Sequence, residues 1–198
     1  MNIRPYFAFQ RSVFAAEFCD RVVAEGETLP HDSNATIGRS DQARRDTTRR
    51  QTELAFFPQS RDYAWLYEPI LQCVQAANAK FWNFRLSGIE RAQYAIYNPE
   101  QFYGWHIDQH PKPYENGPYK GLTRKLSFTL QLTDGADYEG GDFELREPGE
   151  DDVVQRAENT RGRGSVIIFP SFVFHRVTPV TRGVRRSLVG WIIGPPFV

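Results

Sequence analysis

From Ile89 onward, the chain consists of short runs rich in valine, isoleucine, phenylalanine, tyrosine and threonine, separated by clusters of proline, glycine, asparagine and aspartate. This pattern predicts β-strands joined by turns, because branched and aromatic side chains pack well on a pleated surface whereas the separating residues favour turns. Eight short antiparallel strands with irregular connections favour a mainly β jelly roll, whose two sheets leave a mouth for a small ligand. The expected strands lie at 52–57, 90–97, 102–108, 124–132, 142–145, 165–169, 173–177 and 184–193.

The part of the chain before these strands has a helical pattern. Apolar residues recur at steps of three and four over 13–23 and again over 63–74. This spacing predicts two amphipathic helices, and Ser12 and Ser60 stand where a serine can cap the first turn. We expect both helices to cover one outer face of the jelly roll.

A length of 198 residues is usual for one domain. We therefore expect a single domain, with a helical cover mainly at 12–83 and a jelly-roll core at about 50–57 and 89–193. The segment 39–50 contains five arginines, and two readings of it stay open: a solvated surface loop, or a loop that faces the substrate.

The composition argues against several classes of protein. With 24 basic and 24 acidic residues, the chain lacks the positive surplus that nucleic-acid binders use against phosphates. Cys19 and Cys73 lie in apolar, helix-like segments, which favours buried thiols over a disulfide. We find neither an N-terminal secretion signal nor an apolar run of about 18 residues. We therefore expect a cytoplasmic protein without a membrane partner.

A candidate metal centre begins with His106 and Asp108, which alternation places on the same face of a strand. His175 lies in an apolar strand, where a buried imidazole needs a partner. Two imidazoles and a carboxylate form the facial triad of non-haem iron(II) oxygenases, which leaves positions open for a co-substrate and dioxygen. Zn(II) would bind such ligands more tightly, so the prediction of iron depends on the open positions. We expect no catalytic side chain beyond these ligands. We interpret His31 as a surface residue, and we do not expect His110 to be a ligand, because Pro111 follows it and breaks the strand.

About ten residues after His175, the pair Arg185 and Arg186 offers an anchor for the far carboxylate of 2-oxoglutarate. A guanidinium suits this role because its planar fork binds a carboxylate with two hydrogen bonds. Alternation places Ser187 on the same face as Arg185, so both can contact one carboxylate. Arg186 is predicted to lie on the surface.

Four segments in order resemble the 2-oxoglutarate- and iron(II)-dependent dioxygenases, and most closely their prolyl 4-hydroxylase-like branch. The resemblance implies the double-stranded β-helix form of the jelly roll, iron at the His106, Asp108 and His175 triad, and the distal carboxylate on Arg185 with Tyr97 as a second contact. The presence of Asp108 argues against a halogenase, because related halogenases have a small residue there. The segments are 97–108, 138–145, 164–175 and 181–185.

The resemblance implies hydroxylation of a C–H bond, of a prolyl or other residue in a protein or peptide. The alternatives are a hydroxylase of a free amino acid or small metabolite, a nucleic-acid demethylase, and a non-catalytic binding protein of cupin type. The implied cofactors are Fe(II), 2-oxoglutarate and dioxygen, with ascorbate as a candidate reductant; a homodimer is left open. Tyr103 and Trp105 are candidates for the substrate side, although Tyr103 has the wrong parity relative to His106 unless a bulge lies between them.

Overall fold

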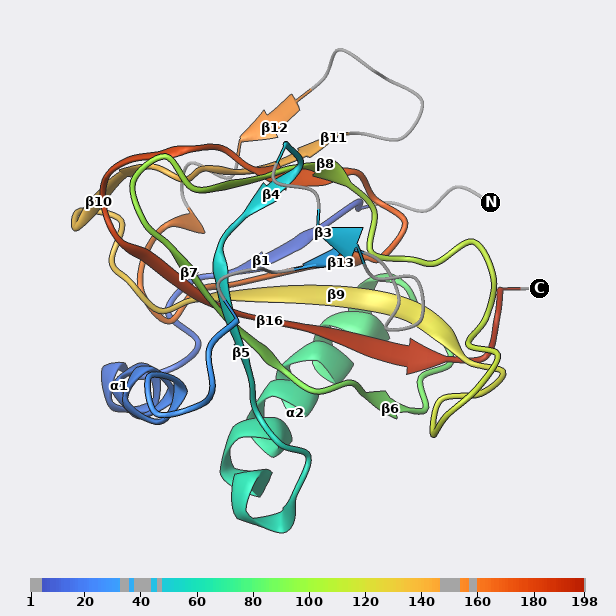
Figure 1. The fold of residues 1–198 in the computed structure, drawn as a ribbon. Helices are drawn as coiled ribbons and strands as arrows, with labels where there is room; N and C mark the ends of the chain where they lie inside the picture. Colours follow the sequence, from blue (N-terminus) through green and yellow to red (C-terminus); the bar gives the residue numbers. More distant parts are fainter. Residues whose placement is uncertain are drawn as a thin grey trace.

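A computed structural model describes residues 5–32, 36–37, 44–45, 48–146, 154–156 and 160–197. It arranges them in layers, with two helices below a large sheet and a smaller sheet above it (Figure 1). The chain is therefore mainly β, as expected. Most of the arginine-rich segment 39–50 lies outside the described residues, which include only the backbone of 44–45 and residues 48–50.

The large sheet has seven strands in the order β1-β13-β9-β16-β7-β5, with β6 paired to β16. Every recorded pairing within it is antiparallel. Its strands are β1 (Ala8–Gln10), β5 (Glu53–Phe56), β6 (Gly88–Ile89), β7 (Gln93–Tyr97), β9 (Thr123–Gln131), β13 (Val166–Pro170) and β16 (Arg185–Gly194).

The smaller sheet has five strands in the order β12-β11-β14-β8-β4. They are β4 (Arg50–Gln51), β8 (Phe102–His106), β11 (Phe143–Arg146), β12 (Val154–Arg156) and β14 (His175–Val177). Two further pairs stand apart: β2 (Thr36–Ile37) with β3 (Arg44–Arg45), and β10 (Tyr138–Gly140) with β15 (Val180–Gly183).

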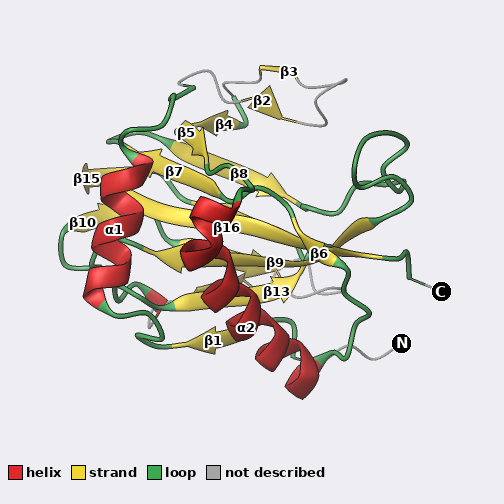
Figure 2. Ribbon diagram, turned by 90° about the horizontal axis from the view of Figure 1, so that it is seen from below, coloured by secondary structure: helices red, strands yellow, loops and turns green. Residues whose placement is uncertain are grey.

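Both predicted helices form, but each is displaced toward the C-terminus. They are α1 (Ala16–Gly26) and α2 (Ala64–Phe81), the second preceded by the 3-10 turn η1 (Arg61–Tyr63). Both lie against one face of the large sheet (Figure 2). The expected serine caps are wrong: Ala15 is the N-cap of α1, and Ser60 precedes the 3-10 turn without a side-chain hydrogen bond. The backbone of Ser12, at a φ of 46°, donates instead to Ser165.

Alternation along the large sheet separates two cores. On β9, Leu126, Phe128 and Leu130 join the core between the large sheet and the helices. Neighbouring strands alternate in the same way, and side chains such as Tyr97 and Ile167 join a second core between the sheets. A Cβ on Gly190 of β16 would lie 2.6 Å from the Phe128 ring, so glycine is required there for the ring to pack. The large sheet is therefore buried on both faces.

The remaining expectations have mixed outcomes. Each of the eight expected strands overlaps one observed strand, and the expected strand at 52–57 contains β5. Eight further short strands are not expected from the sequence, because strands of two to four residues are too short to show alternation: β1, β2, β3, β4, β6, β10, β12 and β15. Both Cys19 and Cys73 are free thiols. Within the described ranges, no helix combines the length and apolar character needed to cross a bilayer.

Candidate metal centre

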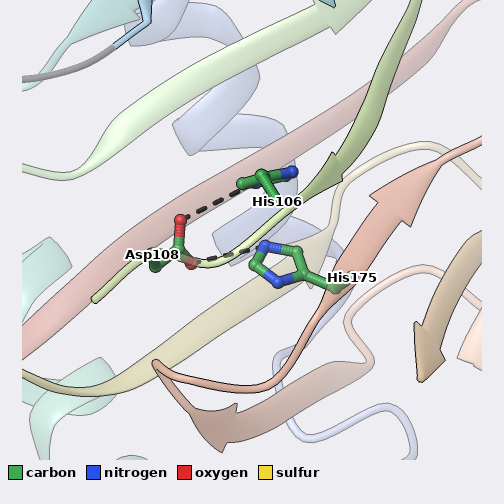
Figure 3. Close-up of side chains that lie close together, drawn as sticks. All are labelled: His106, Asp108 and His175. Atoms are coloured by element: carbon green, nitrogen blue, oxygen red, sulfur yellow. Dashed lines mark ion pairs between the residues drawn. The ribbon is translucent and has the colours of Figure 1, made fainter. Parts of the chain in front are cut away.

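His106, Asp108 and His175 meet in the space between the two sheets (Figure 3). Antiparallel pairing of β14 with β8 sets His175 directly opposite His106, and Asp108 follows two residues after the end of β8. One ligand-type atom from each side chain lies within 4.8 Å of the others. Relative exposures of 4%, 7% and 5% show that all three are buried. The sequence prediction that these side chains converge is therefore confirmed in their geometry.

The backbone orients both imidazoles in the same way. The Nδ1 of His106 lies 2.7 Å from the carbonyl oxygen of Gly104, and the Nδ1 of His175 lies 3.0 Å from that of Val173. A carbonyl oxygen only accepts, so Nδ1 carries the proton in each ring and Nε2 keeps its lone pair. Both Nε2 atoms face Asp108, at 3.7 Å and 3.4 Å from its carboxylate oxygens. This is the tautomer that an imidazole needs to bind a metal through Nε2.

Two serines hold Asp108, one through its carboxylate and one through its backbone. Ser127 on β9 donates its hydroxyl to Oδ2 of Asp108 at 2.7 Å, and the Ser171 hydroxyl lies 3.0 Å from that of Ser127. The backbone N–H of Asp108 donates to the carbonyl of Ser171. Sequence reasoning missed both serines. The available signal was Ser127 itself, a small polar residue that alternates with Leu126 and Phe128 and so lies on the face of the strand away from the helices.

The electrostatics of the cluster favour a neutral imidazole beside an ionised carboxylate. Burial, followed by the charge of His175, lowers the pKa of His106 well below its usual value. Burial by itself raises the pKa of Asp108, but the two imidazoles, Arg124 and the Ser127 hydrogen bond outweigh it and lower this pKa to about 2. Two imidazole lone pairs and a carboxylate suit a divalent first-row metal.

A second pole of the site is formed by Arg185, which is 1% exposed. Its guanidinium donates to the Ser187 hydroxyl at 3.3 Å and to the Gln131 side-chain oxygen at 3.1 Å, and it lies 5.3 Å from the centre of the Tyr97 ring. Its Nε is buried without a hydrogen-bond partner. Among the described residues, no carboxylate forms an ion pair with Arg185, so its buried charge fits an incoming carboxylate.

The strand β8 contains the bulge that the position of Tyr103 requires. His175 pairs with His106 and Val177 pairs with Tyr103, so two steps along β14 face three along β8. The Tyr103 ring consequently turns to the side of His106 and stacks on its imidazole, with 3.5 Å between the ring centres.

Trp105 does not join the site. Its ring packs between the guanidinium groups of Arg146 and Arg176, at 4.6 Å and 4.8 Å, and it is not among the residues that line the pocket. The substrate-side expectation for Trp105 is corrected, because alternation turns it away from His106. His31 contacts the carbonyl of Gly26, outside the cluster.

One pocket of about 1110 Å³ contains the triad together with Arg185, Tyr97 and Ser187. Arg124 on β9 also lines it and forms an ion pair with Glu90 at 2.7 Å. The Arg124 guanidinium lies 3.7 Å from the centre of the Trp191 ring and donates to the backbone carbonyl of Asp108 at 3.4 Å. No sequence pattern predicts this pair, whose members lie 34 residues apart.

Residues 92–193, just over half of the chain, match the 2OG-Fe(II) oxygenase superfamily. A PKHD-type hydroxylase of Idiomarina loihiensis is 33% identical over 100 residues, which cover 48% of this chain and 38% of that protein. A PKHD-type hydroxylase of Picosynechococcus sp. is 32% identical over 132 residues, covering 64% of this chain and 52% of its own. The chain spans about half or less of the length of these relatives.

Solved structures share the fold. A prolyl-4-hydroxylase of Pseudomonas putida superposes with a TM-score of 0.67 at 24% identity, over 94% of this chain and 92% of its own. A prolyl hydroxylase of Trichoplax adhaerens was solved with a peptide fragment of the hypoxia inducible factor oxygen degradation domain. It superposes with a TM-score of 0.69 at 15% identity, over 96% of this chain and 84% of its own. At these identities, the likeness is one of fold.

Proposed function

This chain belongs to the 2OG-Fe(II) oxygenase superfamily, in its prolyl 4-hydroxylase-like branch, and we propose that it hydroxylates a C–H bond of a prolyl or other amino-acid residue in a peptide or protein. The observation that carries the proposal is the presence of two poles in one pocket. At one pole, three buried ligand-type side chains converge; at the other, a buried guanidinium has no carboxylate partner among the described residues.

In this proposal His106, Asp108 and His175 hold the metal through Nε2, a carboxylate oxygen and Nε2. When bound, iron(II) with 2-oxoglutarate and dioxygen supplies the oxidising chemistry. Arg185 binds the distal carboxylate of 2-oxoglutarate, Ser187 stands beside it, and the Tyr97 ring covers the guanidinium from one side. The reaction requires no side chain to act as a general base.

The protein's own contribution is to orient the reacting groups and exclude water. Ser127 keeps the Asp108 carboxylate in one orientation, and the stacked Tyr103 ring forms a wall beside His106. We further propose that the two facing sheets form the double-stranded β-helix barrel of a single domain, that the protein is cytoplasmic, and that ascorbate serves as reductant.

An anaerobic titration separates this proposal from a non-catalytic binding protein. Fe(II) followed by 2-oxoglutarate should produce a weak visible charge-transfer band in the parent protein. His175→Ala should remove the band. Arg185→Gln should retain metal binding but need on the order of 10- to 100-fold more 2-oxoglutarate, because it loses a charge-assisted pair.

Arg186→Gln is the matched control, because its guanidinium forms an ion pair with Glu27 on the surface, outside the pocket. It should behave like the parent. Succinate formation with candidate peptides, free amino acids and single-stranded DNA then identifies the substrate class. A parent protein that gives no band on addition of the keto acid would refute the proposed function.

A further inference from the structure

A second buried guanidinium, that of Arg50, comes from the small sheet, whereas the co-substrate anchor Arg185 comes from the large one. Arg50 on β4 pairs with Tyr103 on β8, and only 8% of it is exposed. Its guanidinium lies 4.3 Å from the centre of the Tyr103 ring, whose other neighbour is the His106 imidazole at 3.5 Å. A single aromatic ring therefore separates the Arg50 charge from a metal-ligand imidazole, inside the same pocket.

Among the described residues, no acidic side chain forms an ion pair with Arg50, whereas the less buried Arg124 and Arg176 are paired with Glu90 and Glu144. The Tyr103 ring is the one contact recorded for the Arg50 side chain within this part of the chain, and its Nε is buried without a hydrogen bond. A ring face compensates only part of the cost of burying a charge. The remaining donors are therefore available to a ligand.

The charges around the metal identify the kind of ligand, and this step rests on the proposed function. The positive charges of a divalent metal and of Arg185 are matched by Asp108 and by the two carboxylates of 2-oxoglutarate. Glu90 matches Arg124. Arg49 and Arg91, which also line the pocket, are offset by Asp32 and Glu115. Among the described residues, the charge of Arg50 is then left over, so the site with metal and co-substrate bound still lacks one negative charge.

We propose that Arg50 binds a carboxylate of the primary substrate and so selects acidic substrates. The planar fork of a guanidinium accepts a carboxylate with two parallel hydrogen bonds, and stacking on Tyr103 holds that fork in one plane. The bound carboxylate would lie one ring away from His106, which brings neighbouring C–H bonds of the same substrate close to the metal centre.

Two sources can supply this carboxylate: an acidic side chain near the reacting residue of a peptide, or the α-carboxylate of a free amino acid. The peptide arm of the test uses acetyl-Glu-Pro-Gly-amide and acetyl-Gly-Pro-Glu-amide, each against its glutamine counterpart. The amino-acid arm uses L-proline against L-prolinamide. Each pair differs by one negative charge and little else.

Binding is measured by calorimetry under nitrogen on protein loaded with Fe(II) and 2-oxoglutarate, for the parent, Arg50→Gln and Arg50→Lys. Arg49→Gln is the matched control, because Arg49, although it borders the pocket, is exposed and its guanidinium donates to the Trp105 carbonyl at 3.4 Å instead of stacking on Tyr103. At least one carboxylate probe should bind the parent on the order of 10- to 100-fold more tightly than its amide.

Arg50→Gln should abolish that preference while leaving the concentration of 2-oxoglutarate that half-saturates the visible band unchanged. Arg50→Lys should retain part of the preference, and Arg49→Gln all of it. The proposal is overturned if no carboxylate probe binds the parent more tightly than its amide, or if Arg50→Gln keeps the preference. The band reports on the proposed function separately, so failure of one is distinguishable from failure of the other.

Discussion

The two sheets that enclose the pocket differ in construction. The large sheet contains strands of nine and ten residues in β9 and β16, has apolar cores on both faces and is covered by two helices. The strands of the small sheet have two to five residues, and its outward-facing Trp105 packs against arginines instead of a helix. The two imidazoles come from the small sheet, whereas Arg185, Ser187 and Gln131 come from the large one.

This difference indicates that the two sheets contribute differently to stability and to the proposed metal site. The long strands β9 and β16 are buried along most of their length and hold the proposed co-substrate anchor in place. Short strands that carry the metal-type ligands depend on contacts across the pocket, such as the Ser127 hydrogen bond to Asp108. Stability and metal binding should therefore respond to substitutions in different sheets.

The largest effect should come from the small sheet. His106→Gln removes a proposed ligand, so metal affinity should fall more than about 100-fold and turnover should disappear. This loss of affinity is larger than the loss expected for a residue that only hydrogen-bonds to a ligand. The free energy of unfolding of the metal-free protein should change by about 1 kcal/mol or less, because one hydrogen bond to Gly104 is lost. Metal titration and urea unfolding test the two parts. A large loss of stability without loss of metal affinity would reverse the proposed division.

The next effect belongs to the large sheet. Phe128→Ala should lower the free energy of unfolding by about 3–5 kcal/mol, because it leaves a cavity where the buried ring packs against Gly190. Phe174→Ala, next to the small sheet, is the matched control: its side chain is 47% exposed, and the change should stay within about 0.5 kcal/mol. Equal losses for the two variants would contradict the comparison.

A substitution at the contact between the sheets should have an intermediate effect. Ser127→Ala removes the hydroxyl that orients Asp108, so metal affinity should decrease on the order of 10- to 100-fold. Ser165→Ala, which removes a buried hydroxyl bound to the backbone of Ser12, should leave metal affinity unchanged. Isothermal titration with Mn(II) measures both. If the two variants bind metal equally well, the large sheet does not position the ligand.

The smallest effect concerns pH. Because the pKa of His106 is lowered in the folded chain, the unfolded chain takes up a proton first as the pH falls below the usual value of 6.5. The metal-free protein should therefore keep its full stability above about pH 6.5 and lose up to about 1.4 kcal/mol per pH unit below it. Urea unfolding from about pH 7.5 to about pH 5 measures this slope. The slope should be smaller in His106→Gln, and equal slopes would assign it to another group.

Much of the fold could be predicted because residues that alternate on long strands carry their own signal. β9 and β16 extend close to their expected ranges, and the convergence of His106, Asp108 and His175 follows from parity and burial. Pairs joined only by the fold carry no such signal. Glu90 and Arg124 are an example, because a sequence does not show which strands become neighbours.

Trp105 and Tyr103 show the limits of parity. Trp105 was expected at the substrate side, yet a residue adjacent to a ligand on an extended strand points to the opposite face. Tyr103 reaches the site only because of the bulge in β8, which no pattern of residue types predicts. The cytoplasmic location, the single domain and the homodimer stay predictions.

The bulge in β8 has a consequence for how this pocket can change. The extra residue lies between Tyr103 and His106, so the aromatic wall and the ligand belong to two separate stretches of regular strand. Deleting one residue between them would turn the Tyr103 ring to the other face of the sheet while the imidazole stays opposite His175. A single-codon deletion would thus replace the aromatic wall of the pocket without altering the proposed metal site.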